Sequence, residues 1–143
     1  MRKLTLSTAE TIISAALEKA EELSLKPLTV VVLDAGGHAI ALKRQDGSSI
    51  MRPQIATGKA VGALAVGTGT RWLNANAETR PHFVNALNGA SGGAIIPVPG
   101  GVLVKNEEGE TLGAVGITGD TSDNDEACAV AGVEAVNLVA DCG

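Results

Sequence analysis

Two pairs of short apolar segments, each joined by a tight polar turn, constrain the fold of this chain more than any other feature. Residues 28–33 and 38–43 flank an Asp-Ala-Gly-Gly turn, and residues 101–105 and 111–118 flank an Asn-Glu-Glu-Gly turn. Short segments rich in Val, Ile and Leu are typical of strands, and Asp, Asn and Gly tolerate the backbone angles of a hairpin turn. Two hairpins predict an antiparallel sheet.

Helical patterns flank and separate these hairpins. Apolar residues recur at helical spacing behind Ser7 and Glu10, which form a capping box for a first helix. Small residues fill a second helical pattern and suit close packing on a sheet, and Pro81 opens a short helical piece. A last helix is expected to begin at Ser122 or Asp123, with acidic residues in its first turn. The predicted helices cover residues 8–24, 50–67, 71–77, 80–87 and the stretch that ends at 141, and a brief further strand is expected at 94–96.

Together these patterns predict one α+β domain over residues 1–143, with the element order α-β-β-α-α-β-β-β-α. No repeat, linker or low-complexity tract divides the chain. Although 45% of the residues are apolar, Trp72 and Phe83 are the only aromatic ones. The core must therefore be built from Ala, Val, Ile and Leu, which favours close approach of the helices to the sheet.

The charge balance limits the partners that this chain can have. The 11 Lys and Arg residues are scattered among 16 Asp and Glu residues, and the formal net charge is −5. Because nucleic-acid binding requires clustered basic residues, no nucleic-acid partner is expected. The longest apolar run, residues 60–67, is far shorter than the roughly 20 residues of a membrane span. The basic start of the chain is not followed by the apolar region of a signal peptide. We therefore expect a soluble, cytoplasmic protein with no membrane partner.

The two cysteines are not expected to form a disulfide. If Cys128 and Cys142 both lie on the last helix, they are roughly 20 Å apart, whereas a disulfide needs Cα atoms within about 7 Å of each other. Cys128 is expected to be a small core residue, with a reactive thiol as the alternative.

The glycines and acids around residue 120 do not match a nucleotide or calcium site. Gly113, Gly116 and Gly119 lack the spacing of a phosphate loop, and the acids of residues 120–126 would repel a phosphate. These acids do not follow the ligand alternation of a calcium loop either. We expect the glycines to mark close backbone approach and the acids to cap the last helix, and no metal site is predicted.

A proline-glycine turn and several basic residues are the candidate ligand-binding groups. Pro99-Gly100-Gly101 can present backbone amides to an anion, or can be a rigid turn that leads into a strand. Arg44, which leaves the second predicted strand together with Asp46, can hold a carboxylate through two hydrogen bonds. Lys59 lies in a helix of small residues, where it either meets the ligand or extends to water. Arg80 is a third cationic candidate.

The two histidines are candidates of a different kind. His38 follows the hairpin glycines and is expected to be solvated. His82 lies beside Arg80 and Phe83, which predicts a more sheltered position, and it is therefore the favoured ligand-binding histidine. Their separation matches no zinc spacing, and the sequence contains no assignable Ser-His-Asp set.

Four short motifs follow one another along nearly the whole chain. They are Leu33 to Gly47 with its Asp-turn-Arg-x-Asp-Gly pattern, Ile55 to Ala60 with an Ala/Lys helix signature, Pro99 to Val102, and the stretch from Gly113 to Gly132 that contains Asp-Glu-x-x-Ala. Each motif alone is weakly specific. In this order they resemble the GlcG/HbpS-like family.

The resemblance implies a profilin-like α+β fold, in which helices flank a five-stranded antiparallel sheet, and it implies homo-oligomerisation. Some members of this family bind haem, and one is implicated in redox sensing through haem degradation with iron release. Others accompany glycolate or diol metabolism. No position here matches an iron-ligating residue of the family, so His82 and His38 are the imidazole candidates if haem is the cofactor.

Four functional hypotheses follow. The leading one is a small-molecule binding protein whose anionic ligand is held by Arg44, Lys59 or Arg80 together with the Pro99-Gly100-Gly101 turn. The second is haem binding with His82, or less favoured His38, as iron ligand. The third is an enzyme acting on a small organic acid, with Lys59 or the Arg44/Asp46 pair in acid–base work. The fourth is a structural subunit of an assembly.

Overall fold

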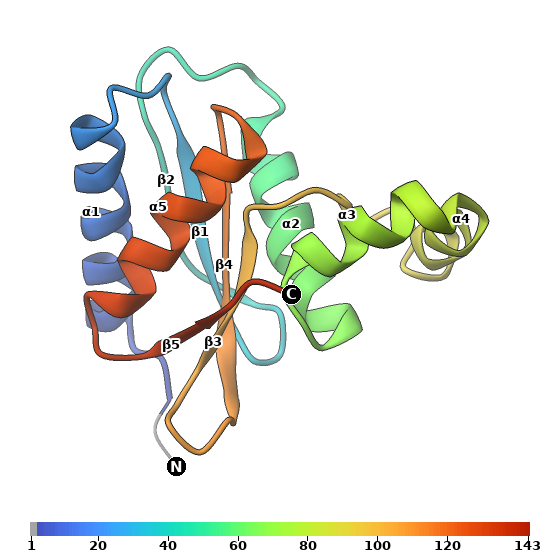
Figure 1. Cartoon of the computed structure of the whole chain (residues 1–143). Coiled ribbons are helices and arrows are strands. Elements are labelled where there is room, and N and C mark those ends of the chain that lie inside the picture. The colour runs from blue at the N-terminus through green and yellow to red at the C-terminus, as the bar shows by residue number, and fades with distance from the viewer. Residues whose placement is uncertain (1–2) are drawn as a thin grey trace.

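The computed structural model describes residues 3–143, which form one five-stranded antiparallel sheet with helices on both faces (Figure 1). The sheet order is β2-β1-β4-β3-β5. The strands are β1 (Thr29–Asp34), β2 (Ala39–Arg44), β3 (Gly101–Lys105), β4 (Thr111–Thr118) and β5 (Val139–Asp141). The helices are α1 (Leu6–Glu22), α2 (Arg52–Val66), α3 (Thr70–Thr79), α4 (Pro81–Ala90) and α5 (Ser122–Glu134). The predicted α+β class, both hairpins and the five-stranded antiparallel sheet are confirmed.

The element order differs from the prediction in the C-terminal half, where it reads α-α-α-β-β-α-β after the first hairpin. Residues 94–96 are not a strand of the sheet, and the fifth strand is β5, which was predicted as part of the last helix. The last helix, α5, ends at Glu134, before the predicted end at residue 141. The chain leaves the helical direction at Asn137, which adopts a left-handed conformation with φ of 60°. The chain then turns back, and β5 pairs with β3 along Leu103 to Lys105.

Both long terminal helices begin at a threonine rather than at the predicted cap. The Thr5 side chain accepts a hydrogen bond from the Thr8 amide, so α1 begins before Ser7. The Thr121 hydroxyl likewise accepts from the Asn124 amide, 3.2 Å away, and caps α5. Each threonine has an extended backbone, which is the conformation that an N-cap residue requires.

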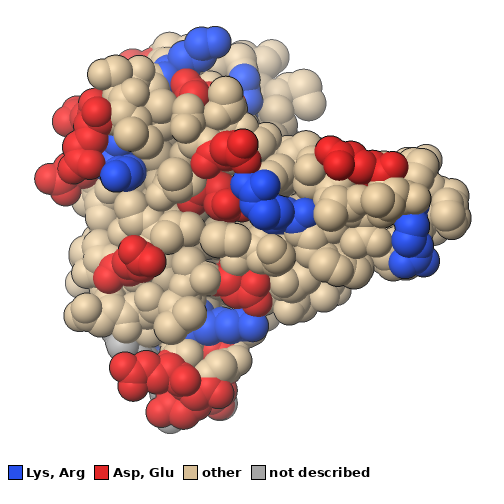
Figure 2. Space-filling view, viewed as in Figure 1, with Lys and Arg blue, Asp and Glu red and all other residues tan. Residues whose placement is uncertain are grey.

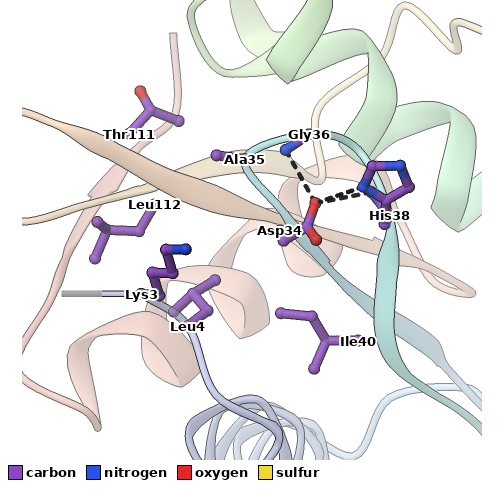
Figure 3. Close-up of a pocket in the computed structure, with 9 residues that line it drawn as sticks. All are labelled: Lys3, Leu4, Asp34, Ala35, Gly36, His38, Ile40, Thr111 and Leu112. Atoms are coloured by element: carbon purple, nitrogen blue, oxygen red, sulfur yellow. Dashed lines mark hydrogen bonds and ion pairs between the residues drawn. The ribbon is translucent and has the colours of Figure 1, made fainter. Parts of the chain in front are cut away.

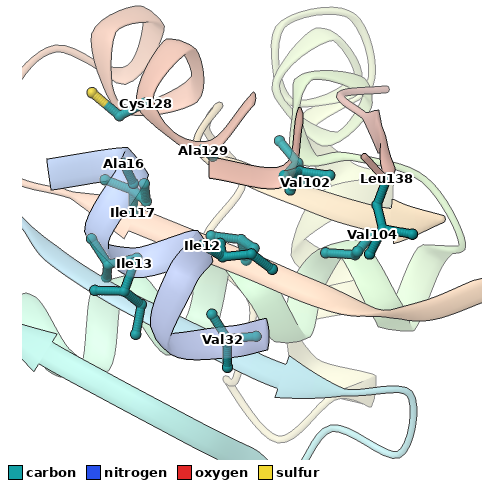
Figure 4. Packing of buried hydrophobic residues seen from close by; sticks show 14 of the residues in the cluster. Ile12, Ile13, Ala16, Val32, Val102, Val104, Ile117, Cys128, Ala129 and Leu138 are labelled. Carbon is teal, nitrogen blue, oxygen red and sulfur yellow. The ribbon is translucent and has the colours of Figure 1, made fainter. Parts of the chain in front are cut away.

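The sheet separates two apolar cores. Val30 and Val32 of β1 pack with α1 and α5, whereas Val31 and Leu33 face α2, as expected from the alternation of side chains along a strand. Figure 4 shows the larger core between the two helices and the sheet. On the other face, a Cβ at Gly116 would overlap the carbonyl oxygen of Ala56, so this glycine lets α2 lie close against β4. The predicted close packing of small residues is confirmed.

Helices α3 and α4 project from the body as an arm (Figure 1). Among the described elements, α4 packs only against α3. The base of the arm is held by Arg71, whose Nε lies 3.0 Å from Glu126 Oε2 and whose Nη2 lies 2.5 Å from Asp123 Oδ1 of α5. Farther out, the rings of Trp72 and Phe83 meet edge to face.

Acidic side chains dominate the face seen in Figure 2, where they gather over α1 and at the β3–β4 turn. None of the described helices has the length and apolar content of a membrane span. Cys128 is buried and Cys142 is half-buried, and both thiols are free, as predicted. Cys142 follows β5, however, and does not lie on the last helix.

Candidate functional site

The predicted ligand-binding residues occupy three separate places in the structure. Lys59 belongs to the first of them and is buried between α2, β4 and α5, with 2% of its side chain exposed. Its Nζ donates to the Ile117 carbonyl oxygen at 2.9 Å and to Asp125 Oδ2 at 3.1 Å. Asp125 Oδ1 in turn accepts from the Asp120 amide. The ammonium group therefore neither extends to water nor lines a described pocket.

The Pro99-Gly100-Gly101 turn covers Lys59. Gly100 has φ of +118°, and a Cβ there would lie 2.9 Å from Lys59 Nζ. The Gly101 amide donates to Thr70 Oγ1 at 3.0 Å and is not available to an anion. All three residues of the turn are buried. The geometry is that of the rigid turn leading into β3, and it seals the buried ion pair.

Burial shifts both partners of this ion pair toward their neutral forms. Desolvation lowers the pKa of Lys59, and the nearby Asp125 carboxylate only partly offsets it. Desolvation likewise raises the pKa of Asp125 against the attraction of Lys59. Removing one member of such a buried pair leaves an uncompensated charge and strongly destabilises the fold, which gives Lys59 a structural role.

Arg44 and Asp46 form the second place. They line an open surface depression of about 440 Å³ together with Pro27 and Gln45. Arg44, Asp46 and Pro27 are exposed, and Gln45 is committed to the backbone amide of Leu28. The predicted Arg44/Asp46 pairing in one location is thus present, but its surroundings are solvent.

Arg80 and His82 form the third place, on the arm. The Arg80 guanidinium lies 4.3 Å from the centre of the Phe83 ring, and the side chains of Arg80 and His82 are exposed. The prediction that His82 is sheltered is wrong, because α4 stands away from the body and has only α3 as a neighbour. Neither residue lines a pocket among the described ones.

A pocket that combines apolar walls with polar groups lies instead at the β1–β2 turn (Figure 3). We call it the turn pocket; its volume is about 340 Å³. It is lined by Lys3 and Leu4 ahead of α1, by residues 34–36, 38 and 40 of the hairpin, and by Thr111 and Leu112 of β4. Segments that are distant in sequence therefore meet here, at the end of the sheet where β1 stops.

His38 stands at the rim of the turn pocket and is held there by Asp34. One carboxylate oxygen, Asp34 Oδ1, lies 3.3 Å from His38 Nδ1 and also accepts from the amides of His38 and Gly36. The hydrogen bond from the His38 amide lowers the pKa of Asp34 and outweighs the opposing desolvation. In the tautomer that donates from Nδ1 to this carboxylate, Nε2 keeps its lone pair. The prediction that His38 is solvated is confirmed, because 81% of its side chain is exposed.

Gly36 provides the space that the imidazole occupies. A Cβ at this position would lie 3.0 Å from both Cε1 and Nδ1 of His38. A contact that short would require the ring to shift by a few tenths of an ångström, so the absence of a side chain at Gly36 leaves room for the ring where it lies. Within this one turn, Asp34 therefore contacts the imidazole of His38 and Gly36 leaves room for it.

A third hollow lies between α2 and residues 93–96. It is about 590 Å³ in volume, and Met51, Ile55, Val61 and Ile96 are among its mainly apolar lining. No charged side chain lines it. It therefore lacks the groups that would hold an anion, whereas the turn pocket has Lys3 and an imidazole. Among residues 3–143, no cluster of three or more metal-ligating side chains is present.

The fold and the turn pocket define a small α+β domain with a ligand-sized cavity at one end of its sheet. Residues 4–134 match the family model described as haem degrading protein HbpS-like, and the chain therefore belongs to the HbpS-like family. No protein of the curated set is significantly similar in sequence.

Solved structures share the fold over almost the whole chain. PduOC, solved as a haem complex, is 25% identical with a TM-score of 0.85, and the match covers 96% of this chain and 97% of that one. The Klebsiella pneumoniae protein ORFY is 25% identical with a TM-score of 0.86, covering 96% and 92%. A double mutant of Streptomyces reticuli HbpS is 26% identical with a TM-score of 0.79, covering 94% and 87%.

Proposed function

We propose that this chain binds a small anionic molecule in the turn pocket and that haem is a ligand which the donor set of this pocket fits. The observation that carries the proposal is the imidazole of His38, which lines the pocket and whose Nδ1 lies 3.3 Å from Asp34 Oδ1. Metal-ligating histidines commonly donate their other ring N–H to a carboxylate in this way. Imidazole is also the protein ligand of haem iron in globins and peroxidases.

The other residues that line the pocket suit a ligand that is apolar in its body and anionic at its edge. Leu4, Ile40 and Leu112 offer apolar surface to the body of the ligand, and Lys3 offers a positive charge to its carboxylate. At about 340 Å³ the pocket is at the lower end of ligand-binding cavities. Because the imidazole at its rim is largely exposed, a macrocycle held by His38 would be only partly enclosed.

Haem, when bound, would supply an iron centre capable of redox chemistry. What the chain contributes is an imidazole beside the Asp34 carboxylate, a positive group for a carboxylate and an apolar surface that excludes water from one side. The relatives support this reading, since PduOC was solved as a haem complex and the family description is that of haem-degrading proteins.

Hemin titration followed by absorbance tests the proposal. We expect a saturable Soret shift at one haem per chain, and we expect His38→Ala to move the band and weaken binding. His82→Ala is the matched control, because it removes the other histidine from an exposed position on the arm, and it should leave the spectrum unchanged. A Soret band that is the same in His38→Ala as in the wild type would overturn the assignment of His38 as the iron ligand.

Gly36→Ala separates the position of the imidazole from its presence. The added Cβ displaces the ring while Asp34 and His38 both remain, so hemin affinity should fall although the chain keeps both histidines. Metal-free protoporphyrin serves as a second probe, because its binding depends on the apolar surface and Lys3 but not on iron ligation. Its affinity should be insensitive to His38→Ala and should fall in Lys3→Ala.

We also propose that the chain acts as a homo-oligomer. Its support is the family resemblance together with two large apolar side chains just before α2, Ile50 and Met51, which are 86% and 61% exposed. Light scattering coupled to size-exclusion chromatography measures the mass directly. A monomeric mass across the accessible concentration range would contradict the proposal.

A further inference from the structure

The hollow between α2 and residues 93–96 is distinct from the turn pocket, and we call it the α2 hollow. At about 590 Å³ it lies within the usual range of small-molecule sites, which is about 300–1,000 Å³. Its lining is mainly apolar and includes Met51, Ile55, Val61 and Ile96. No charged side chain among residues 3–143 lines it. A charged group that entered would lose water and gain no counter-charge, so the α2 hollow favours an uncharged ligand.

The outer wall of the α2 hollow is attached directly to the helix at Gly58. A Cβ at this position would lie 2.5 Å from Ile96 Cγ1 and 3.0 Å from the carbonyl oxygen of Ala94. The Ile96 amide donates to the Gly58 carbonyl oxygen at 3.2 Å. Ile95, which is buried, packs over Gly62 one turn farther along α2. The wall is therefore already in place without a ligand, as is usual for small-molecule sites.

Two uncharged polar side chains, Gln54 and Thr57, also line the α2 hollow. They are three positions apart on α2 and therefore lie on the same face of the helix. Gln54 is exposed and Thr57 is half-buried, and residues 3–143 give neither side chain a hydrogen-bond partner. Both can therefore donate to or accept from a hydroxyl or carbonyl group of a ligand.

We propose that the α2 hollow binds an uncharged, mainly apolar small molecule that carries one hydroxyl or carbonyl group. The apolar body of the ligand lies against Ile55 and Ile96, and its polar group reaches Thr57 or Gln54. Met51 also lines the hollow and is 61% exposed, so a bound ligand covers apolar surface that water otherwise contacts. This site requires no haem, and the hemin titration of the turn pocket does not bear on it.

Titration of octan-1-ol into protein that carries ¹³C-methyl methionine tests the site directly. Met1 and Met51 are the two methionines of the chain, so the spectrum contains two methyl signals, and Met51→Leu assigns them. The Met51 signal should shift and saturate. Octanoate is the matched probe, because it has the same chain length and a carboxylate in place of the hydroxyl. It should bind at least about tenfold more weakly, since its charge finds no cation in the lining.

Thr57→Val tests the polar contact, because valine has nearly the same shape as threonine and lacks only the hydroxyl. The variant should bind octan-1-ol about 2- to 10-fold more weakly, which is the contribution of one hydrogen bond. Toluene has no polar group and should bind wild type and Thr57→Val equally, which separates a lost hydrogen bond from a distorted hollow. Thr79→Val is the control variant, since Thr79 lies on the arm and its hydroxyl donates to the Ala75 carbonyl oxygen. It should bind octan-1-ol with wild-type affinity.

Four results would overturn the proposal. The first is a Met51 signal that does not move up to the solubility limit of octan-1-ol. The second is octanoate that binds as tightly as octan-1-ol, because the site would then not select an uncharged ligand. The third is equal affinity of wild type and Thr57→Val for octan-1-ol, which would remove the polar contact. The last is a Met51 signal that moves with protein concentration and not with octan-1-ol, because a second copy of the chain would then fill the hollow.

Discussion

Replacing Lys59 by methionine is the most informative perturbation of the core. Methionine has a similar length and fills the volume of the lysine stem, but it leaves the Asp125 carboxylate without its counter-charge. Both side chains are essentially inaccessible, at 2% and 1% exposed, so water cannot replace the lost ammonium. Removing one member of a buried pair typically costs about 3–5 kcal/mol.

The structure indicates the lower end of that range. Asp125 Oδ1 keeps the hydrogen bond from the Asp120 amide, and only Oδ2 and the Ile117 carbonyl lose their donor. We therefore expect Lys59→Met to lower the free energy of unfolding by about 3 kcal/mol, which corresponds to a fall in Tm of roughly 10 °C for a domain of this size. The double variant Lys59→Met/Asp125→Asn carries no orphaned charge and should recover about half of that loss.

Urea denaturation of the wild type, both single variants and the double variant measures the coupling between the two side chains. The loss in Lys59→Met should also shrink as pH falls, because burial raises the pKa of Asp125 and a protonated carboxyl needs no counter-charge. A carboxyl whose pKa is raised in the folded state contributes stability at low pH that is lost as pH rises. Two outcomes would show that the buried ion pair does not hold this part of the fold. One is a free energy of unfolding for Lys59→Met within about 1 kcal/mol of the wild-type value. The other is a double variant that is no more stable than Lys59→Met.

Three further predictions concern features away from the pair. Arg71→Ala should lower the free energy of unfolding by less than about 1 kcal/mol, because the guanidinium is partly exposed. Amide hydrogen exchange in α3 should nevertheless accelerate, because the hydrogen bonds from Arg71 to Glu126 are lost. Unchanged exchange would contradict this. Gly100→Ala should destabilise by at least about 2 kcal/mol in thermal melts, because its φ is left-handed and its Cβ would meet Lys59. Burial raises the pKa of the Cys128 and Cys142 thiols to about 11, so both should react slowly with a disulfide reagent at neutral pH until the protein is unfolded; fast labelling of the native protein would show otherwise.

The hairpins could be predicted because the information for each lies within one short stretch. The turn 34–37 contains both the strand ends and the glycine that reverses the chain, and β1 pairs with β2 from Thr29 to Leu33. The fifth strand could not be predicted in the same way. Val139–Asp141 is three residues long, and its identity as a strand depends on the free edge of β3.

The candidate site could likewise be predicted only where its residues are close together in the sequence. Asp34 and His38 are four positions apart in one turn, so an Asp at a strand end followed by that histidine was a signal available in the sequence. The prediction favoured His82 because its neighbours in sequence are large, whereas only the fold shows that α4 leaves the body. Lys59 was misjudged because its partner Asp125 is 66 positions away. No local pattern distinguishes a buried, paired lysine from a solvated one.

The interior position of β1 in the sheet has a consequence for how the chain reaches its fold. This strand pairs on one side with its neighbour β2 and on the other with β4, where Thr29 lies opposite Thr118. The second pairing must close a loop that contains α2 and the whole arm, and that loop-closure entropy is lost before the central contacts are gained. The high contact order of the sheet centre predicts refolding in milliseconds to seconds rather than microseconds. Until β4 pairs with β1, the first hairpin has an unpaired edge on β1 as well as the outer edge of β2, and the chain is then most exposed to misassociation.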